Sequence, residues 1–354
     1  MKKTVLLKVD SEDPDIGKIR VAAGFIRSGG LVAFPTETVY GLGADALNAA
    51  AVLALFEAKK RPLDNPPIVH VCEVKDVCRV AEEVPAAAGL LMRRFWPGPL
   101  TLVLKRSRVV PDVAVAGLDT VAVRMPRHCV ALALIRESGC PISAPSANLA
   151  GKPSPTLAEH VLEDLDGRID AVLDGGPTVV GVESTVVDVT VDPAEVLRPG
   201  GTSFEALKAV LGGGVVLNPA VAADRPVPVG LVRSPGLKHK HYAPDANVVV
   251  VEGELSAVVG KVNELVAYYM GRGSRVGVLC TAETAGSYRA DVVKSLGSRN
   301  DMRSVAQSLF ARLREFDLER VDVIVAEGVP LEGLGLAVMN RLRRASGYKI
   351  VKAS

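Results

Sequence analysis

The 354-residue sequence has few aromatic residues: one Trp, six Tyr and seven Phe. So small a set argues against a long base-stacking surface for single-stranded nucleic acid. Neither sign of charge is in excess, because 42 Lys and Arg nearly balance 40 Asp and Glu and leave a net charge of +2. Proteins dedicated to duplex binding usually carry a strong basic excess. Any contact with nucleic acid is therefore expected to be local.

The sequence also lacks paired cysteines. Its five cysteines are an odd number and include no C-x-x-C pair, so neither a disulfide framework nor a thiolate zinc site is indicated. We expect them to be reduced, buried thiols. They are Cys72, Cys78, Cys129, Cys140 and Cys280.

Long apolar runs are missing as well. No stretch of 18 apolar residues is uninterrupted, which excludes a membrane-spanning helix of the usual kind. The N-terminal segment MKKTVLLKVDSEDPD has an apolar stretch too short for the hydrophobic region of a signal peptide. The sequence therefore predicts a cytoplasmic protein without a membrane partner.

The standard nucleotide-binding and catalytic signatures are absent. The sequence contains no G-x-x-x-x-G-K-[ST], no G-x-G-x-x-G between a strand and a helix, no H-E-x-x-H, no EF-hand loop and no G-x-S-x-G. If the protein binds phosphate, it must do so through a less common kind of site.

The composition that remains is that of a folded globular protein, with 48% hydrophobic and 23% charged residues. The length exceeds what one compact core usually holds, so we expect two domains. Up to residue 211, apolar strand-like runs alternate with helical stretches, which predicts a large α/β domain with a twisted sheet. The expected strands are residues 31–34, 68–71, 100–104, 120–123, 171–173 and 185–189. The expected helices are residues 16–27, 49–59, 74–83, 86–95, 128–137, 157–165 and 203–210.

Residues 212–245 differ from the rest because they are dense in Gly and Pro and have no stable periodicity. We interpret them as a linker, and the basic stretch RSPGLKHKHYAP within it as a segment that contacts something anionic. Strand and helix patterns resume over residues 246–354, which predicts a smaller, doubly wound, Rossmann-like domain. Its expected elements are residues 248–252, 256–270, 275–280, 302–316, 321–326 and 335–345.

Polar residues gather on loops at strand ends, where α/β sheets usually bind ligands. The loop FPTETVYGLGADA begins at Phe34 and exposes Thr36 and other polar side chains before two glycines. In EAKKRPLDNPPIVHV, a helix ends at Lys59 and Arg61, and Pro62 prevents its continuation. Cations at a helix C-terminus are favourable for dipole reasons alone, but Lys and Arg are also the usual partners of a triphosphate.

A further loop, PISAPSANLAGKPSPT, offers small hydroxyls and a carboxamide between prolines, which lets a ligand approach the backbone closely. Ser-Pro turns of this kind also cap ordinary structures, so this loop alone is ambiguous. The remaining candidates lie at the ends of other predicted strands. They are Thr120, Arg124, Glu183, Ser184, Thr185 and Arg198.

Seven separated motifs in order resemble the YrdC-type threonylcarbamoyl-AMP synthases: FPTETVYGLG, EAKKRPLDNPPIVHV, FWPGPLTLVL, TVAVRMP, APSANLAGKPSPT, ESTVVDV and LRPGG. The linker SPGLKHKHYAP and the Rossmann-like tail resemble the long, two-domain form of that family. The resemblance implies an enzyme, a nucleotidyltransferase that condenses L-threonine, bicarbonate or carbon dioxide, and ATP into threonylcarbamoyl-AMP and diphosphate. The product serves threonylcarbamoylation of the adenosine beside the anticodon in tRNAs that read codons beginning with A.

The resemblance also implies the site residues. The catalytic tetrad K-x-R plus S-x-N falls on Lys59, Arg61, Ser146 and Asn148. The implied threonine-binding residues are Thr36, His70, Arg124, Ala144 and Ser184. The implied ATP-binding residues are Lys59, Arg61, Asn65, Thr120, Ser146, Ser154, Arg198 and Tyr242.

Mg²⁺ is expected to act with ATP, held mainly by phosphates and not by a dedicated protein site. We expect the linker to cover the ATP pocket as a lid, the product to pass to the tRNA threonylcarbamoyl transferase machinery, and contact with tRNA to be indirect or weak. One alternative is an RNA-binding module in which Lys59, Lys60, Arg61 and Lys152 line a basic surface. A carbamoyltransferase accessory domain is disfavoured, because no acylphosphatase-like segment or zinc-finger cysteine pattern precedes the domain.

Overall fold

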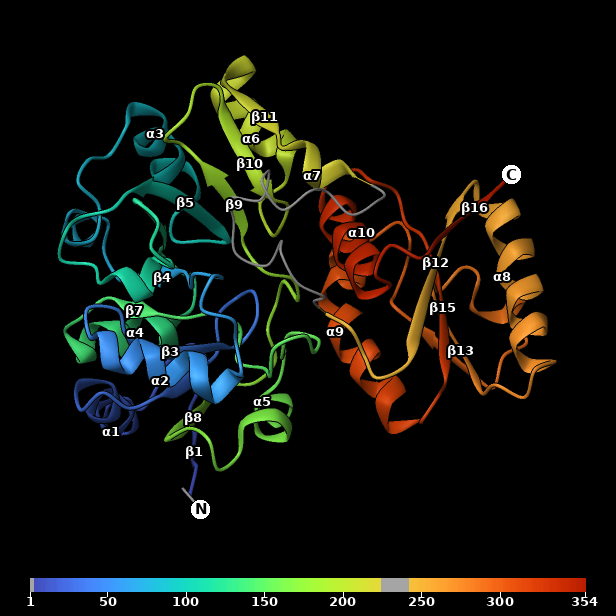
Figure 1. The fold of residues 1–354 in the computed structure, drawn as a ribbon, viewed down its shortest axis with the longest axis horizontal. Helices are drawn as coiled ribbons and strands as arrows, with labels where there is room; N and C mark the ends of the chain where they lie inside the picture. The colour runs from blue at the N-terminus through green and yellow to red at the C-terminus, as the bar shows by residue number, and fades with distance from the viewer. Residues whose placement is uncertain (1–2, 224–241) are drawn as a thin grey trace. The chain divides into compact units, whose positions relative to one another are not determined.

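The computed structural model describes residues 3–223 and 242–354, and its contacts divide the chain into two units. The first unit includes residues 3–150 and 154–221, and the second includes residues 151–153 and 242–354 (Figure 1). Most of the predicted linker, including its basic stretch up to His241, lies outside the described residues.

The first unit is built on a mixed sheet with the strand order β1-β8-β2-β3-β7-β4-β6-β5-β9-β10-β11. Near the centre, β3, β7, β4 and β6 are adjacent without being consecutive in sequence, so residues far apart along the chain meet there. The strands are β1 Val5–Lys8, β2 Val32–Phe34, β3 Gly41–Asp45, β4 Val69–His70, β5 Leu100–Lys105, β6 Thr120–Arg124, β7 Ile142–Ser143, β8 Ala171–Asp174, β9 Thr185–Asp188, β10 Ala194–Arg198 and β11 Val215–Leu217.

Helices pack apolar faces against this sheet. Ile19 and Ile26 of α1 share one buried cluster with Phe34 and Leu134, while Leu91 of α3 belongs to another. Burial of these apolar surfaces is the main force that holds the unit together. The helices are α1 Ile16–Arg27, α2 Ala49–Lys59, α3 Ala86–Phe95, α4 Cys129–Ser138, α5 Ala158–Leu165, α6 Phe204–Leu211 and α7 Pro219–Ala222, with 3₁₀ turns η1 Val74–Arg79, η2 Asp112–Val115 and η3 Gly212–Gly214.

The second unit is a parallel five-stranded sheet with the order β14-β13-β15-β12-β16. Helix α8 covers one face, and α9 and α10 cover the other (Figure 1), as the right-handed crossover rule requires for connections that run in opposite directions. This confirms the predicted doubly wound fold. The elements are β12 Asn247–Gly253, α8 Leu255–Met270, β13 Val276–Cys280, η5 Ala285–Ser287, β14 Val292–Ser295, α9 Met302–Leu318, β15 Val323–Glu327, α10 Leu334–Ala345 and β16 Ile350–Ala353.

Some local expectations were wrong. The helix expected over residues 74–83 is only the 3₁₀ turn η1, and residues 41–45, read as loop, form strand β3. Gly43 allows this strand to pack closely, since a Cβ there would lie 2.9 Å from Phe34 and from Ile142. Strand β11 lies within the stretch assigned to the linker and pairs in parallel with β10.

All five cysteines are unpaired, as expected, but Cys78 and Cys129 are exposed rather than buried. Burial raises the pKa of Cys140 to about 12 and that of Cys280 to about 12, so these two thiols are poor nucleophiles. None of the helices in the described residues has the length and apolar character needed to cross a bilayer.

Candidate functional site

The centre of the first sheet brings two of the predicted threonine ligands side by side. His70 at the end of β4 and Arg124 at the end of β6 are register partners in a parallel pair. On the other side of β6, Arg124 is opposite Thr101 of β5. These three residues therefore form a polar row across adjacent strands, in an otherwise apolar part of the sheet.

Arg124 is buried, and the loop after β2 holds its guanidinium. Nη1 donates to Thr38 Oγ1 at 2.9 Å, Nε donates to the Gly98 carbonyl at 3.2 Å, and Nη2 lies 2.6 Å from Glu37 Oε2. Thr38 is in turn 2.8 Å from the hydroxyl of Thr36. The predicted ligands Thr36 and Arg124 are thus joined through Thr38.

Glu37 supplies a second charge at the same place. Its side chain is almost fully buried, and Oε1 has no hydrogen-bond partner within the described residues. A buried acceptor without a partner is costly unless a ligand or water satisfies it. The Arg124–Glu37 pair therefore presents one positive and one negative group together.

His70 is a neutral member of this row. Burial lowers its pKa to about 3, and the nearby Arg124 charge acts in the same direction. Its Nδ1 lies 3.1 Å from the carbonyl oxygen of Ile68, which also accepts from the backbone N–H of Ala144 at 2.8 Å. The structure therefore brings His70 and Ala144, two further predicted threonine ligands, to the same carbonyl group.

The predicted catalytic tetrad lies around the C-terminus of α2. Asn48 caps the start of this helix by accepting from Ala50 N at 3.0 Å, and Lys60 ends it in a left-handed conformation with φ 52°. The buried ammonium of Lys59 then donates to the carbonyls of Ser146 and Asn148. Ser146 Oγ also donates to the Asn148 side chain at 2.6 Å. The K-x-R and S-x-N segments are therefore in direct contact.

Arg61 extends this cluster toward the predicted ATP residue Asn65. Its Nε donates to the Asn65 carbonyl at 2.8 Å, and its Nη2 donates to the Pro66 carbonyl at 3.2 Å. These bonds fold residues 61–66 into a tight loop with the guanidinium held on one side of it.

Ser184 joins the two predicted ligand sets. Its hydroxyl is 2.7 Å from that of Thr101, the register partner of Arg124, and its carbonyl accepts from Arg198 Nη2 at 2.9 Å. Beside it, Ser154 Oγ donates to Glu183 Oε1 at 2.5 Å. Predicted ATP ligands Arg198 and Ser154 thus lie next to the predicted threonine ligand Ser184.

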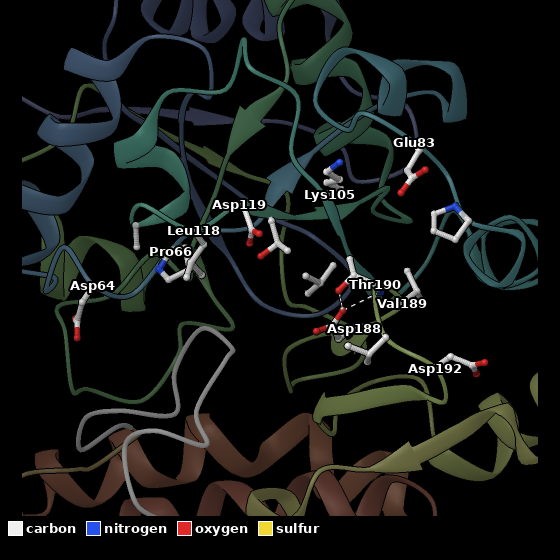
Figure 2. A pocket seen from close by; sticks show the side chains of 15 residues that line it. Asp64, Pro66, Glu83, Lys105, Leu118, Asp119, Asp188, Val189, Thr190 and Asp192 are labelled. Atoms are coloured by element: carbon white, nitrogen blue, oxygen red, sulfur yellow. Dashed lines mark hydrogen bonds between the residues drawn. The ribbon is translucent and has the colours of Figure 1, made fainter.

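Thr120 lies at the opposite end of β6 from Arg124, in a cavity of about 760 Å³ (Figure 2). The cavity also includes Pro66, whose carbonyl binds Arg61. Figure 2 shows several carboxylates around it, among them Asp119 and Asp188. Within the part of the chain that the structure describes, no group of three or more His, Cys, Asp or Glu is arranged to hold a metal ion.

Tyr242 belongs to the second unit, where its ring stacks on Phe310 at a centroid distance of 5.3 Å. The guanidinium of Arg341 lies over the same ring, 5.4 Å from its centroid. The role of Tyr242 at ATP remains a prediction.

Sequence reasoning missed three residues that organise the site. Glu37 and Thr38 stood in a recognised loop but received no role, and Thr101 was treated as an ordinary strand residue. The available signal for Thr101 was a single hydroxyl in the apolar run LTLVL.

Family comparisons match both units. Residues 24–200 match the Sua5/YciO/YrdC model, described as telomere recombination, and residues 202–347 match the model described as threonylcarbamoyl-AMP synthase, C-terminal domain.

Similar proteins cover nearly the whole chain. It is 54% identical over 335 residues to threonylcarbamoyl-AMP synthase of Pyrococcus abyssi, which covers 95% of this chain and 96% of that protein. Its identity to the Bacillus subtilis enzyme of the same name is 49% over 347 residues, or 98% of this chain and 96% of that one. The crystal structure of P. abyssi Sua5 complexed with L-threonine matches with a TM-score of 0.94 and 53% identity, covering 99% of this chain and 100% of that one.

Proposed function

We propose that this chain, which belongs to the Sua5/YrdC family of threonylcarbamoyl-AMP synthases, condenses L-threonine, bicarbonate or carbon dioxide, and ATP into threonylcarbamoyl-AMP and diphosphate. The observation that carries the proposal is a link between two clusters, one of Arg124 with Glu37 and the other of the cations Lys59 and Arg61. The loop after β2 that pairs with Arg124 is hydrogen-bonded to the loop that accepts from Lys59, since the N–H of Ala147 donates to the Tyr40 carbonyl at 2.8 Å.

The Arg124–Glu37 pair suits a zwitterion. A free amino acid carries a carboxylate, which a guanidinium binds bidentately, and an ammonium, which a carboxylate binds. Glu37 Oε1 is the acceptor available for that ammonium. Its carboxylate would also receive the proton that the amine must lose before it attacks carbon dioxide or bicarbonate.

Neutral hydroxyl and imidazole groups lie near Arg124, because His70 is its register partner, Thr36 contacts Thr38, and Ser184 contacts Thr101. The buried groups of His70, Thr36 and Ser184 can pair with the side-chain hydroxyl of threonine. Valine would leave such partners unsatisfied, at a cost of about 1–3 kcal/mol for each buried polar group. We therefore expect the site to favour threonine over valine.

The second step needs positioning and positive charge. The carbamate oxygen displaces diphosphate from the α-phosphorus, and no covalent enzyme intermediate is required. Lys59 and Arg61 would stabilise the charge that develops on the phosphate oxygens, and Ser146, Asn148 and Arg198 would orient the nucleotide. Magnesium bound with ATP would neutralise further charge, held by phosphate oxygens and water, since the described residues offer no three-ligand cluster.

We further propose that the protein works in the cytoplasm, where its product passes to the tRNA threonylcarbamoyl transferase machinery, with indirect or weak tRNA contact. The alternative of an RNA-binding surface is less well supported. Lys59 is almost fully buried and donates to the carbonyls of Ser146 and Asn148, so it cannot line an open basic surface.

The test is diphosphate release by the purified protein with ATP and bicarbonate, with L-threonine present, omitted or replaced by L-valine. We expect release to depend on threonine. Lys59→Ala and Arg61→Ala should each reduce it by at least about tenfold, since a charge-assisted hydrogen bond contributes about 1.5–3 kcal/mol. Lys60→Asn is the matched control, because Lys60 is exposed and Asn tolerates its left-handed backbone. Threonine-independent release, or wild-type rates in both alanine variants, would contradict the proposal.

A further inference from the structure

The second unit has a cavity where the direction of its sheet connections reverses. Strand β12 leads through α8 to β13, whereas β15 leads through α10 to β16 on the other side. Strands β12 and β15 are adjacent and parallel, so their carboxyl ends flank the crevice between two oppositely running connections. Open α/β sheets bind ligands at such a point. A cavity of about 290 Å³ lies there.

Both strand ends and the following loop line this cavity. Glu252 and Gly253 come from the end of β12, Met339 from α10, and Arg299 from the segment before α9. The remaining lining is the loop of residues 328–331 that follows β15. The walls therefore combine apolar side chains with one carboxylate and one guanidinium.

The loop between β15 and α10 is rich in glycine at positions of close approach. A Cβ on Gly328 would lie 2.9 Å from the Val251 carbonyl, and one on Gly335 would lie 1.9 Å from the Pro330 carbonyl. Gly333 precedes α10 and provides no capping side chain, while the N–H of Gly335 in the first turn donates to the Glu332 carbonyl at 2.9 Å. Strand, glycine-containing loop and helix N-terminus follow one another as in dinucleotide-binding units.

Arg299 is fixed in place by a buried carboxylate. Its Nη1 donates to Glu327 Oε1 at 2.8 Å and to the Gly328 carbonyl at 3.0 Å. Glu327 is fully buried and also accepts from Thr281 Oγ1 and from Tyr288 Oη, at 2.7 Å each. Within the described residues, Nε and Nη2 of Arg299 form no hydrogen bond. The bonds of Nη1 thus fix the guanidinium at the cavity, and Nε and Nη2 are available to donate to a ligand.

Glu252 provides an acceptor at the end of the neighbouring strand. Arg343 donates to both of its oxygens at 2.7 and 3.0 Å, and Lys352 donates to Oε2 at 2.7 Å. These cations outweigh burial and keep the pKa of Glu252 below its ordinary value. A carboxylate has about four lone-pair sites, so these three bonds leave room to accept from a ligand hydroxyl.

We propose that this cavity binds a mononucleotide. The phosphate lies against Arg299, a ribose hydroxyl donates to Glu252, and the base packs on Pro330, Leu331 and Met339. The cavity volume of about 290 Å³ is at the small end of ligand pockets and does not suit a dinucleotide. The inference is independent of the function proposed for the first unit.

The test uses the full chain with ¹³C-methyl-labelled methionine, of which the sequence has six. The Met339 methyl resonance, assigned with Met339→Leu, is followed by NMR during titration with AMP, adenosine or inorganic phosphate. The titration is repeated in Arg61→Ala, which weakens nucleotide binding in the first unit. We expect a saturable AMP-dependent shift with the same Kd in both proteins, and at least about tenfold weaker binding of adenosine and of phosphate alone.

Variants of the cavity separate binding from folding. Leu331→Glu places a negative charge on an exposed lining residue and should weaken AMP binding at least about tenfold, whereas Leu318→Glu, also exposed but outside the cavity, should not. Arg299→Lys keeps a positive charge beside Glu327 but loses the planar fork, and should also weaken binding. The proposal is overturned if AMP gives no saturable shift, if phosphate alone binds as well as AMP, or if the two Leu variants behave alike.

Discussion

At the scale of single residues, the Arg124–Glu37 pair is the feature that most restricts the chemistry. Taking two opposite charges out of water is expensive, and a buried pair often contributes little to folding stability. Here Arg124 donates to Thr38 and Gly98, but its Nη2 and both carboxylate oxygens of Glu37 form no hydrogen bond within the described residues, although Nη2 lies 2.6 Å from Oε2. These open positions on both partners are better explained by a ligand that carries both charges than by a purely structural pair.

Replacing Glu37 with Gln tests this explanation. The amide keeps the shape of the carboxylate but loses the charge that attracts an ammonium group and receives its proton. We expect the KM for threonine in diphosphate release to rise at least about tenfold, because a hydrogen bond to a charged group contributes about 1.5–3 kcal/mol. The KM for ATP should change far less. Glu57→Gln, on the exposed side of α2, is the control. An unchanged KM for threonine in Glu37→Gln would show that the pair is structural.

His70 makes a prediction about pH and folding stability. Its pKa is about 3 in the folded protein, against an ordinary value of 6.5, so the unfolded chain takes up the proton first as pH falls. This residue's contribution to the free energy of unfolding is therefore fully present above pH 6.5 and is lost as pH falls from 6.5 toward 3. The slope is at most about 1.4 kcal/mol for each pH unit.

Urea unfolding at several pH values measures this contribution. His70→Gln should have a flatter decline in stability than the wild type between pH 6 and 4, and the same slope at pH 7 to 8. Parallel curves over the whole range would mean that His70 is accessible to protons in the folded protein.

The sequence identified the polar loops but not which side chains meet within them. Thr36 and Arg124 were both predicted, yet their connection through Thr38 depends on the pairing of β4 with β6 and on the position of the loop after β2. Thr101 is found only through the register of β5 with β6. Such long-range pairings leave no local periodicity in the sequence, so the geometry of the site could not be predicted from it.

At the scale of elements, long periodic segments were predicted well and short ones poorly. Helices α1, α2 and α3 have the bounds expected from their apolar pattern. Strands β3 and β11 were missed because glycines and a short length obscured their alternation. Residues 212–214 looked like the start of a linker, yet the next strand, β11, completes one edge of the first sheet.

Two adjacent residues of β11 test whether this strand belongs to the folded first unit. Val215 is buried in the main hydrophobic cluster, and Val216 is 40% exposed on the opposite face. Val215→Asp should lower the free energy of unfolding by about 3 kcal/mol or more, because it buries a charge without a partner. Val216→Asp should change it by less than about 0.5 kcal/mol. Similar effects in the two variants, measured by urea unfolding, would place β11 outside the cooperative unit.

At the scale of the whole molecule, chain length was the guide to organisation. The length predicted two domains, and the structure has two units with separate sheets. The boundary expected at residue 211 stays a prediction; by its contacts, the first unit continues to Val221. The lid expected over residues 212–245 lies mostly outside the described residues, so it stays a prediction. The description of this segment resumes at Tyr242.

Tyr242 offers the test of how that segment acts. Its ring stacks on Phe310 and lies under Arg341 in the second unit, which anchors the end of the predicted lid. If anchoring is its role, Tyr242→Phe should form threonylcarbamoyl-AMP at the wild-type rate, because it keeps the ring. Tyr242→Ala should be several-fold slower, since the stacking contribution of about 0.5–1.5 kcal/mol is lost together with its buried area. Tyr268→Ala, on the half-exposed surface of α8, controls for loss of an aromatic ring elsewhere in the unit. Equal losses in the Phe and Ala variants would instead show that the hydroxyl acts on ATP directly.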